Sequence, residues 1–173
     1  VIISFNLPFL MKEHHFTSGN SGIMISLFFL AIMTPGFFLN QIVAVWKKKT
    51  KFYCMLLMAA GMALIVFFRS EWLIGLGCIF TGFAYGIIQP IAYDNTTRTA
   101  LPAKVTLALA FVMAMNYLAI LLCPFIIDAL SSIFHTKSQQ FPFILNMVIA
   151  LIAAVWAYMK QDSFLFNDSY KKV

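Results

Sequence analysis

The chain has 173 residues, of which 62% are hydrophobic and 10% are charged, and its mean hydropathy is +0.89. A soluble domain carries roughly 25% charged residues, so this composition excludes an ordinary soluble protein. The formal net charge of +6 could suggest a nucleic-acid partner, but the charges lie in short segments between apolar stretches, which argues against one.

Long stretches without an acidic or basic residue follow one another along the chain. A helix needs about 17–25 apolar residues to cross a hydrocarbon layer of ~30 Å, and a helix satisfies its own backbone hydrogen bonds there. We therefore predict an all-α polytopic membrane protein with six transmembrane helices, the first of them truncated. The predicted helices cover residues 1–11, 21–46, 52–68, 72–94, 103–130 and 141–159.

These helices are expected to form one bundle over residues 1–159, and residues 160–173 are expected to form a polar cytoplasmic tail. The first helix is only half as long as a span requires, Val1 is not an initiator Met, and the residues have no signal-peptide pattern. We interpret the chain as a fragment whose N-terminal part is missing.

The charges between the helices predict an orientation. Successive gaps fall on alternate sides of the membrane, so one side collects nine Lys and Arg residues and the other collects three. The nine are Lys47, Lys48, Lys49, Lys51, Arg98, Lys104, Lys160, Lys171 and Lys172. Because Lys and Arg accumulate in cytoplasmic loops, both ends of this segment are predicted to be cytoplasmic, in a plasma (inner) membrane.

The helix predicted at 72–94 has the most regular pattern. Cys78, Gly82, Gly86 and Pro90 recur every four residues, which places small residues and then a Pro on one face. Such strips let helix backbones approach closely in lipid. The strip therefore indicates helix packing, or alternatively a packing face that also slides during transport. In the helix predicted at 21–46, Pro35-Gly36 predicts a kink.

Four of the amides inside the apolar segments are candidates for a site, and no charge lies near a helix centre, where it would cost about 2.5–3.5 kcal/mol. The amides are Asn6, Gln89, Asn116 and Asn146. They could line one polar substrate cavity. The alternative is interhelical hydrogen bonding, worth about 0.6 kcal/mol for each bond.

Three charged residues lie at helix ends and are candidates for gating or coupling. Asp94 and Arg98 have the i,i+4 spacing of an ordinary helix-end ion pair, which could also form part of an inner gate. Asp128 lies near the outer end of its predicted helix, and we interpret it as an interface carboxylate or, alternatively, as a site of proton coupling.

The sequence carries no recognisable catalytic motif, and we expect no enzyme activity, no cofactor and no metal. Cys54, Cys78 and Cys123 lie in apolar segments without metal-ligand spacing. No nucleophile motif or phosphate-binding loop accompanies them.

Several motifs together resemble the major facilitator superfamily of transporters. The run from Gly75 to Pro90 resembles the tenth helix of that family, and Pro102-Ala103-Lys104 with the later Cys123-Pro124 resembles the eleventh helix and the loop before it. Asn6-Leu7-Pro8-Phe9-Leu10 and Ser21-Gly22 are similar to parts of the seventh and eighth helices. The likeness covers almost the whole chain, as helices seven to twelve.

One stretch departs from the family pattern. The loop between the eighth and ninth helices of the family often carries an acidic signature, but here Ala44 and Lys47 stand where an Asp and the second Gly are expected. The basic cluster that follows is retained. A gating ion pair from this loop is therefore not expected.

The resemblance implies a secondary transporter that works by alternating access, with substrate bound near the midplane between two six-helix halves. The implied partners are the lipid bilayer, a small-molecule substrate, a proton and the N-terminal half of the same protein. The closest branch is that of drug or sugar proton antiporters, which export their substrates. The alternative is a self-contained six-helix membrane scaffold, receptor or assembly protein.

Overall fold

The computed structural model describes residues 2–13, 16, 18–46, 49–136 and 138–159. The described part of the chain is helical and contains no strand, so the predicted all-α fold is confirmed. The helices are α1 (Ile2–Glu13), α2 (Ser18–Trp46), α3 (Thr50–Phe67), α4 (Glu71–Thr99), α5 (Val105–Ile133) and α6 (Phe141–Met159), with the short 3-10 helix η2 (Pro102–Lys104) before α5. The tail predicted at 160–173 lies outside the described residues.

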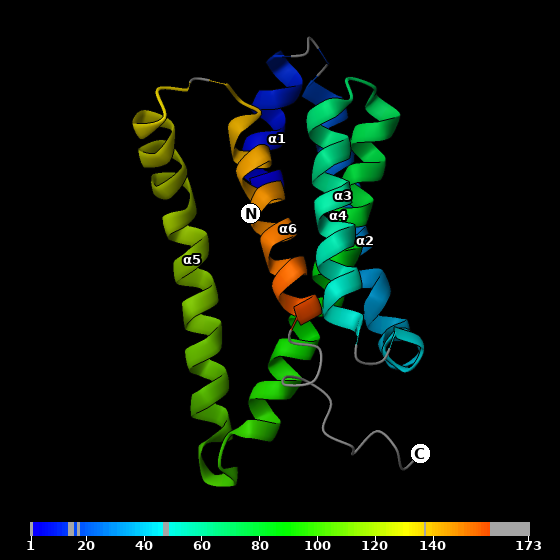
Figure 1. Ribbon diagram of the computed structural model, residues 1–173, viewed down its shortest axis with the longest axis vertical. Coiled ribbons are helices and arrows are strands. Elements are labelled where there is room, and N and C mark those ends of the chain that lie inside the picture. The colour runs from blue at the N-terminus through cyan, green and yellow to red at the C-terminus, as the bar shows by residue number, and fades with distance from the viewer. Residues whose placement is uncertain (1, 14–15, 17, 47–48, 137, 160–173) are drawn as a thin grey trace.

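Five of the described helices, α2 to α6, are long and apolar enough to cross a membrane. Helix α1 has 12 residues, which at 1.5 Å per residue extend about 18 Å, short of a ~30 Å hydrocarbon core. Consecutive helices run in opposite directions (Figure 1). One end of the bundle therefore carries the α1–α2, α3–α4 and α5–α6 connections, and we call it the three-connection end. The opposite end, the two-connection end, carries the α2–α3 and α4–α5 connections.

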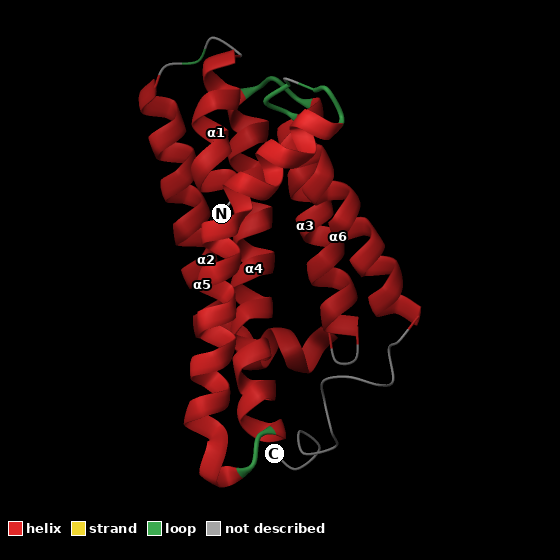
Figure 2. Ribbon diagram, turned by 90° about the vertical axis from the view of Figure 1, so that its left-hand side faces the viewer, coloured by secondary structure: helices red, strands yellow, loops and turns green. Residues whose placement is uncertain are grey.

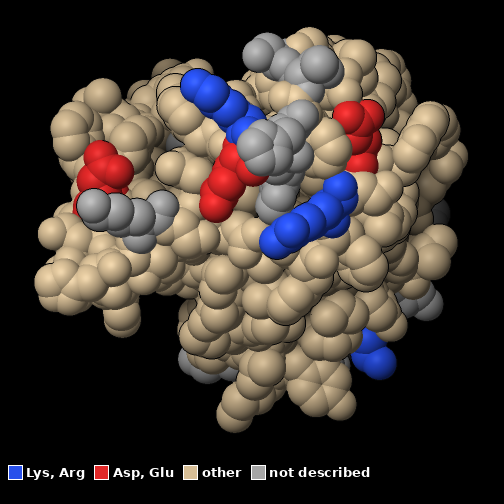
Figure 3. Space-filling model, turned by 90° about the horizontal axis from the view of Figure 1, so that it is seen from above, with Lys and Arg blue, Asp and Glu red and all other residues tan. Residues whose placement is uncertain are grey.

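Both signs of charge occur at the three-connection end, which Figure 3 shows from above. At this end the Asn20 amide donates a hydrogen bond of 2.5 Å to the Glu71 carboxylate, and this bond ties the start of α2 to the start of α4. Lys49, Lys51, Arg98 and Lys104 belong to the connections and helix ends of the two-connection end. The cytoplasmic assignment of the two-connection end stays a prediction.

Helix α4 continues five residues beyond its predicted end at residue 94. Threonine hydroxyls bond to carbonyl oxygens one turn back, Thr96 to Ala92 at 2.8 Å and Thr99 to Asn95 at 2.7 Å, so polar residues remain helical here. The prediction was wrong because it ended the helix where the apolar run ends, whereas a helix can project out of the bilayer. The backbone leaves the helix at Ala100, two residues before Pro102.

The main apolar core lies toward the three-connection end and joins five helices. The residue Leu7 from α1 and Phe143 from α6 are fully buried in it. Its buried members are Ile3, Leu7, Leu10, Met11, Met24, Phe28, Met62, Ile65, Val66, Ile74, Cys78 and Phe143. A smaller cluster toward the other end joins α2, α3 and α4 through Val43, Cys54, Ile87 and Ile91.

Glycines let α4 approach two neighbours at once. A Cβ added at Gly82 or Gly86 would collide with the backbone carbonyl oxygens of Phe28 and Ile32 of α2. On another side of α4, a Cβ at Gly77 would lie 2.6 Å from the carbonyl oxygen of Gly61 of α3. Because real Cβ atoms do not tolerate such distances, each position requires glycine.

The predicted small-residue strip thus has its glycines, Gly82 and Gly86, against α2, while Cys78 is buried in the main core. Pro90, the last member of the strip, is half-buried inside α4. The second contact, between Gly61 and Gly77, was not predicted. Whether the strip also slides during transport stays a prediction.

Helix α2 bends in its second half, which contains Pro35. Its last turns are seen nearly end-on in Figure 1 and from the side in Figure 2. Proline removes one backbone hydrogen bond from a helix, so a bend past this position has a physical cause.

Helix α5 stands apart from the other helices along most of its length (Figure 1). Of its 29 residues, Ile127 is the one that is buried. Large apolar side chains such as Phe111 and Phe125 are about two-thirds exposed. An apolar helix this exposed requires lipid or another apolar surface around it.

The glycine contacts predict a sharp difference between two otherwise similar substitutions. Gly86→Ala should destabilise the bundle by about 1–3 kcal/mol, because the added methyl group forces α4 away from the α2 backbone. Gly22→Ala is the matched control, since no atom lies within 4 Å of the position of its Cβ. It should be neutral or stabilising, because alanine is the better helix former by about 1 kcal/mol. Thermal unfolding in detergent or nanodiscs measures both, and equal stabilities would contradict the proposed close contact.

Candidate functional site

The middle of α4 presents three polar side chains on one face. Tyr85, Gln89 and Tyr93 follow one another at intervals of four residues, which places them on one side of a helix. The Gln89 amide Nε2 donates a hydrogen bond of 3.0 Å to the hydroxyl oxygen of Tyr93. All three side chains are half-buried.

Helix α5 contributes two further polar side chains beside this face. The Asn116 amide lies close enough to the Tyr85 hydroxyl for the two polar groups to interact. The hydroxyl groups of Tyr93 and Tyr117 lie close enough to Tyr85 to interact with it electrostatically. We call these five residues, Tyr85, Gln89 and Tyr93 of α4 with Asn116 and Tyr117 of α5, the tyrosine–amide cluster.

The tyrosine–amide cluster extends from the middle of the span, where Tyr85 and Asn116 lie, toward the two-connection end. Asn116 is 12 residues from Lys104 and 12 residues from Asp128 along the chain (116 − 104 and 128 − 116), or about 18 Å in each direction along a helix. Asn116 is thus as far as α5 allows from the charges at the ends of that helix, whereas Tyr93 of α4 directly precedes Asp94. Its hydrogen bonds are between neutral groups, and each is worth about 0.6 kcal/mol in a membrane.

Two of the four predicted amides, Gln89 and Asn116, lie on the contacting helices α4 and α5, and each has a tyrosine of α4 beside it. The other two lie on different helices, Asn6 on α1 and Asn146 on α6, where both are half-buried. Neither makes a side-chain hydrogen bond within the part of the chain that the structure describes. A single cavity lined by all four amides stays a prediction.

Sequence reasoning missed the three tyrosines. The signal was present in the i, i+4, i+8 spacing of Tyr85, Gln89 and Tyr93. Tyrosine is common in membrane helices as an interface residue, and its depth becomes informative only when a polar partner on a second helix is known.

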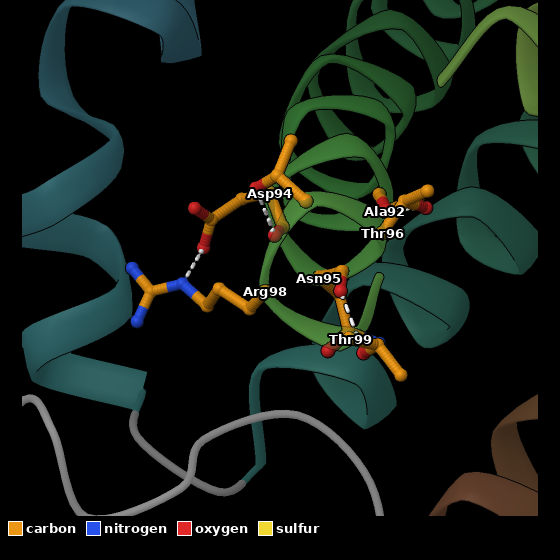
Figure 4. A network of polar contacts seen from close by, with 7 residues as sticks. Ala92, Asp94, Asn95, Thr96, Arg98 and Thr99 are labelled. Atoms are coloured by element: carbon orange, nitrogen blue, oxygen red, sulfur yellow. Dashed lines mark hydrogen bonds and ion pairs between the residues drawn. The ribbon is translucent and has the colours of Figure 1, made fainter. Parts of the chain in front are cut away.

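Asp94 and Arg98 form the ion pair that their spacing predicts (Figure 4). The Arg98 Nε donates to Asp94 Oδ2 at 2.8 Å, and the two side chains are 48% and 47% exposed. An exposed i,i+4 pair contributes about 0.3–0.5 kcal/mol, and Arg98 in the last turn also favours the helix dipole. A gating role for the pair stays a prediction.

Asp128 is exposed on α5, five residues before that helix ends at Ile133. Within the described residues it forms no ion pair. No group of three or more His, Cys, Asp or Glu side chains that could hold a metal ion is found in the described ranges. The site that the structure does assemble is therefore the uncharged tyrosine–amide cluster.

Comparison with known proteins identifies one family. Residues 1–165 match the family profile described as the Major Facilitator Superfamily. Searches among curated proteins and among solved structures found no match. The matched range contains α1 to α6 and hence the whole tyrosine–amide cluster.

The contact between Tyr85 and Asn116 predicts a measurable coupling between α4 and α5. In a double-mutant cycle of Tyr85→Phe and Asn116→Ala, the two changes should be non-additive by about 0.6 kcal/mol, the mean for such bonds in membranes. Unfolding of the bilayer-reconstituted protein measures the four stabilities. Tyr158→Phe on α6 is the control, because Tyr158 packs against Phe52 and lies outside the cluster. Additive effects for both tyrosines would contradict the contact.

Proposed function

Because this chain belongs to the major facilitator superfamily, a family of multi-pass membrane transporters, we propose that it forms the C-terminal six-helix half of a secondary transporter. The transporter would move a small solute across the membrane by alternating access. The chain is an integral membrane protein in contact with the lipid bilayer, which its five span-length apolar helices require.

The observation that carries this proposal is the tyrosine–amide cluster, in which Tyr85 and Asn116 lie at the middle of the span. Transporters of this architecture bind substrate near the bilayer midplane, where two repeats meet. Polar side chains at this depth are costly unless they have partners, and they mark substrate paths in membrane proteins. Gln89 and Asn116, with the tyrosines around them, are the side chains we assign to substrate contact.

The uneven packing of the helices fits alternating access. The glycine contacts fix α4 against α2 and α3, so these three helices can move as one body. Helix α5 is held mainly through its contact with α4 and has one buried residue. In our proposal the exposed sides of α5 and of its neighbours meet the N-terminal six-helix half, and the two halves rock around the bound solute.

We propose ion-coupled efflux as the direction and energy source, with the proton as the coupling ion. The cluster contains amides and aromatic side chains, which suit the drug or sugar antiporter branch better than a branch that binds ions. Asp128, an ionisable group within a membrane helix, is the candidate for proton coupling. The Asp94–Arg98 pair is the candidate for the inner gate, with both ends of this segment in the cytoplasm of a plasma membrane.

Replacing either amide of the cluster by leucine tests substrate contact. In the full-length protein, Asn116→Leu and Gln89→Leu should each lower the rate of transport at least about tenfold, a loss of 1.4 kcal/mol or more, while membrane insertion is unchanged. Uptake into proteoliposomes from a panel of compounds, with and without a proton gradient, measures both rate and coupling.

The matched control is Gln41→Leu, which removes an exposed amide from α2 far along the chain from the cluster. It should retain transport. Equal losses in all three variants would remove the cluster from the transport path. If the wild-type protein moved no solute in any condition, the scaffold, receptor or assembly role would be favoured instead.

A further inference from the structure

We propose that the surface formed by the ends of α2, α3 and α6 at the two-connection end binds the headgroup of an anionic phospholipid, in preference to a zwitterionic one. The proposal does not depend on the transport function. It rests on a continuous row of aromatic rings, on the lysines beside that row, and on the scarcity of acidic residues around them.

Four aromatic side chains form a row that crosses three helices. The ring centroids of Trp46 on α2 and Tyr53 on α3 are 5.5 Å apart, and those of Tyr53 and Phe52 are 5.6 Å apart. Phe52 in turn lies 5.5 Å from Tyr158 on α6. All three are distances of interacting aromatic pairs. We call these four residues the aromatic row, and Figure 1 shows the ends of α6, α3 and α2 next to one another where it lies.

The aromatic row lies at the depth of the membrane interface. Trp46 is the last residue of α2, Tyr53 is in the first turn of α3, and Tyr158 directly precedes the last residue of α6. Tryptophan and tyrosine favour this level, because their rings contact acyl chains while their polar atoms reach the headgroups. Tyr53 and Tyr158 are 39% and 57% exposed, and neither hydroxyl bonds to a described residue. One edge of the row is therefore available to lipid.

Lysines adjoin the aromatic row. Lys49 and Lys51 stand between Trp46 and Tyr53 in the sequence, on either side of the first residue of α3. Lys49 is exposed and Lys51 is half-buried. A lysine at this level can lay its aliphatic stem along apolar surface and extend its ammonium group to a phosphate. Row and lysines together match a phospholipid, in which apolar chains adjoin an anionic group.

The sequence around the row supplies positive charge and no negative charge. Between Glu13 and Glu71 it contains no acidic residue. Within the described part of the chain, the acidic residue of the two-connection end is Asp94, which is paired with Arg98 on the same helix at 2.8 Å. The surface is therefore complementary in charge to an anionic headgroup.

The aromatic row favours a lipid over a soluble phosphate ester as the source of the phosphate. Lysine attracts the phosphate of either molecule. The exposed rings of Tyr53 and Tyr158 in addition require apolar surface beside the phosphate, and the acyl chains of a lipid supply it. Membrane orientation explains on which side the lysines lie, but it does not explain their place beside four contacting rings.

Tryptophan fluorescence tests the proposal, because Trp46 belongs to the aromatic row. The full-length protein is reconstituted in liposomes of phosphatidylcholine and phosphatidylglycerol, with one lipid and then the other brominated as a short-range quencher. The quenching of Trp46 is the difference between the protein and its Trp46→Phe variant. At equal mole fractions, phosphatidylglycerol should be enriched about fivefold at Trp46, the factor that corresponds to about 1 kcal/mol for one lysine near the membrane surface. Trp72, measured in the same way with Trp72→Phe, is the control at the three-connection end, where Arg69 and Glu71 carry opposite charges, and it should show little preference.

Charge-matched variants separate a binding site from a general attraction of anionic lipid to a basic surface. Lys49→Gln and Lys104→Gln each remove one positive charge from the two-connection end, but Lys104 belongs to η2 in the α4–α5 connection, away from the ends of α3 and α6 (Figure 1). Lys49→Gln should lower the enrichment at Trp46 at least about threefold, and Lys104→Gln should leave it nearly unchanged. Tyr158→Leu should also lower the enrichment, although the charge stays the same. Equal effects of the two lysine substitutions would overturn the proposal.

Three further results would also overturn it, and each leaves the proposed transport function intact. Equal quenching of Trp46 by the two lipids would make the aromatic row a helix-packing contact only. Displacement of the lipid by an equal concentration of glycerol 3-phosphate would assign the surface to a soluble phosphate ester. Enrichment that appears only in a variant without residues 160–173 would assign the surface to that segment of the chain.

Discussion

In lipid there is no hydrophobic force between helices, so α4 holds its neighbours by van der Waals packing and hydrogen bonds, and its closest packing is against their backbones. Gly82 and Gly86 meet carbonyl groups of α2, and Gly77 meets Gly61 of α3. These contacts fix the position of α4 on two sides. The arrangement of the site follows from them, because they decide which remaining face of α4 is left to meet α5.

That remaining face carries Tyr85, Gln89 and Tyr93. Along α4, glycines contact the tightly packed helices α2 and α3, and Tyr85 lies beside Asn116 of the loosely packed α5. The tyrosine–amide cluster consequently lies between a rigid three-helix unit and a helix with one buried residue. In the proposed transport function, a solute bound there can move α5 relative to the other helices while few packing contacts are lost.

Much of the fold could be predicted because a helix in a membrane satisfies its own backbone hydrogen bonds, so whether it forms depends on the sequence of that segment. The lengths of the apolar runs indicated the helices, and the i,i+4 spacing of Asp94 and Arg98 indicated their ion pair, which forms. The end of α4 could not be predicted from hydropathy, since Thr96 and Thr99 satisfy their hydroxyls within a helix that continues past the apolar run. The Gly61–Gly77 contact was not predicted, because it joins one glycine from each of two helices and such a pair forms no repeating pattern in the sequence.

The sequence by itself determined that this chain crosses a membrane as helices, because buried backbone groups in lipid have no other partners than those within the helix. It also determined which side chains were available for a site. Only the tertiary structure decided that Asn116 of α5 lies beside Tyr85 of α4, the helix that also carries Gln89, while Asn6 and Asn146 lie on other helices. The physical reason is that close contacts between residues distant in sequence, here the glycine contacts, decide which face of a helix meets which neighbour. The pattern of residues within one helix does not specify that neighbour.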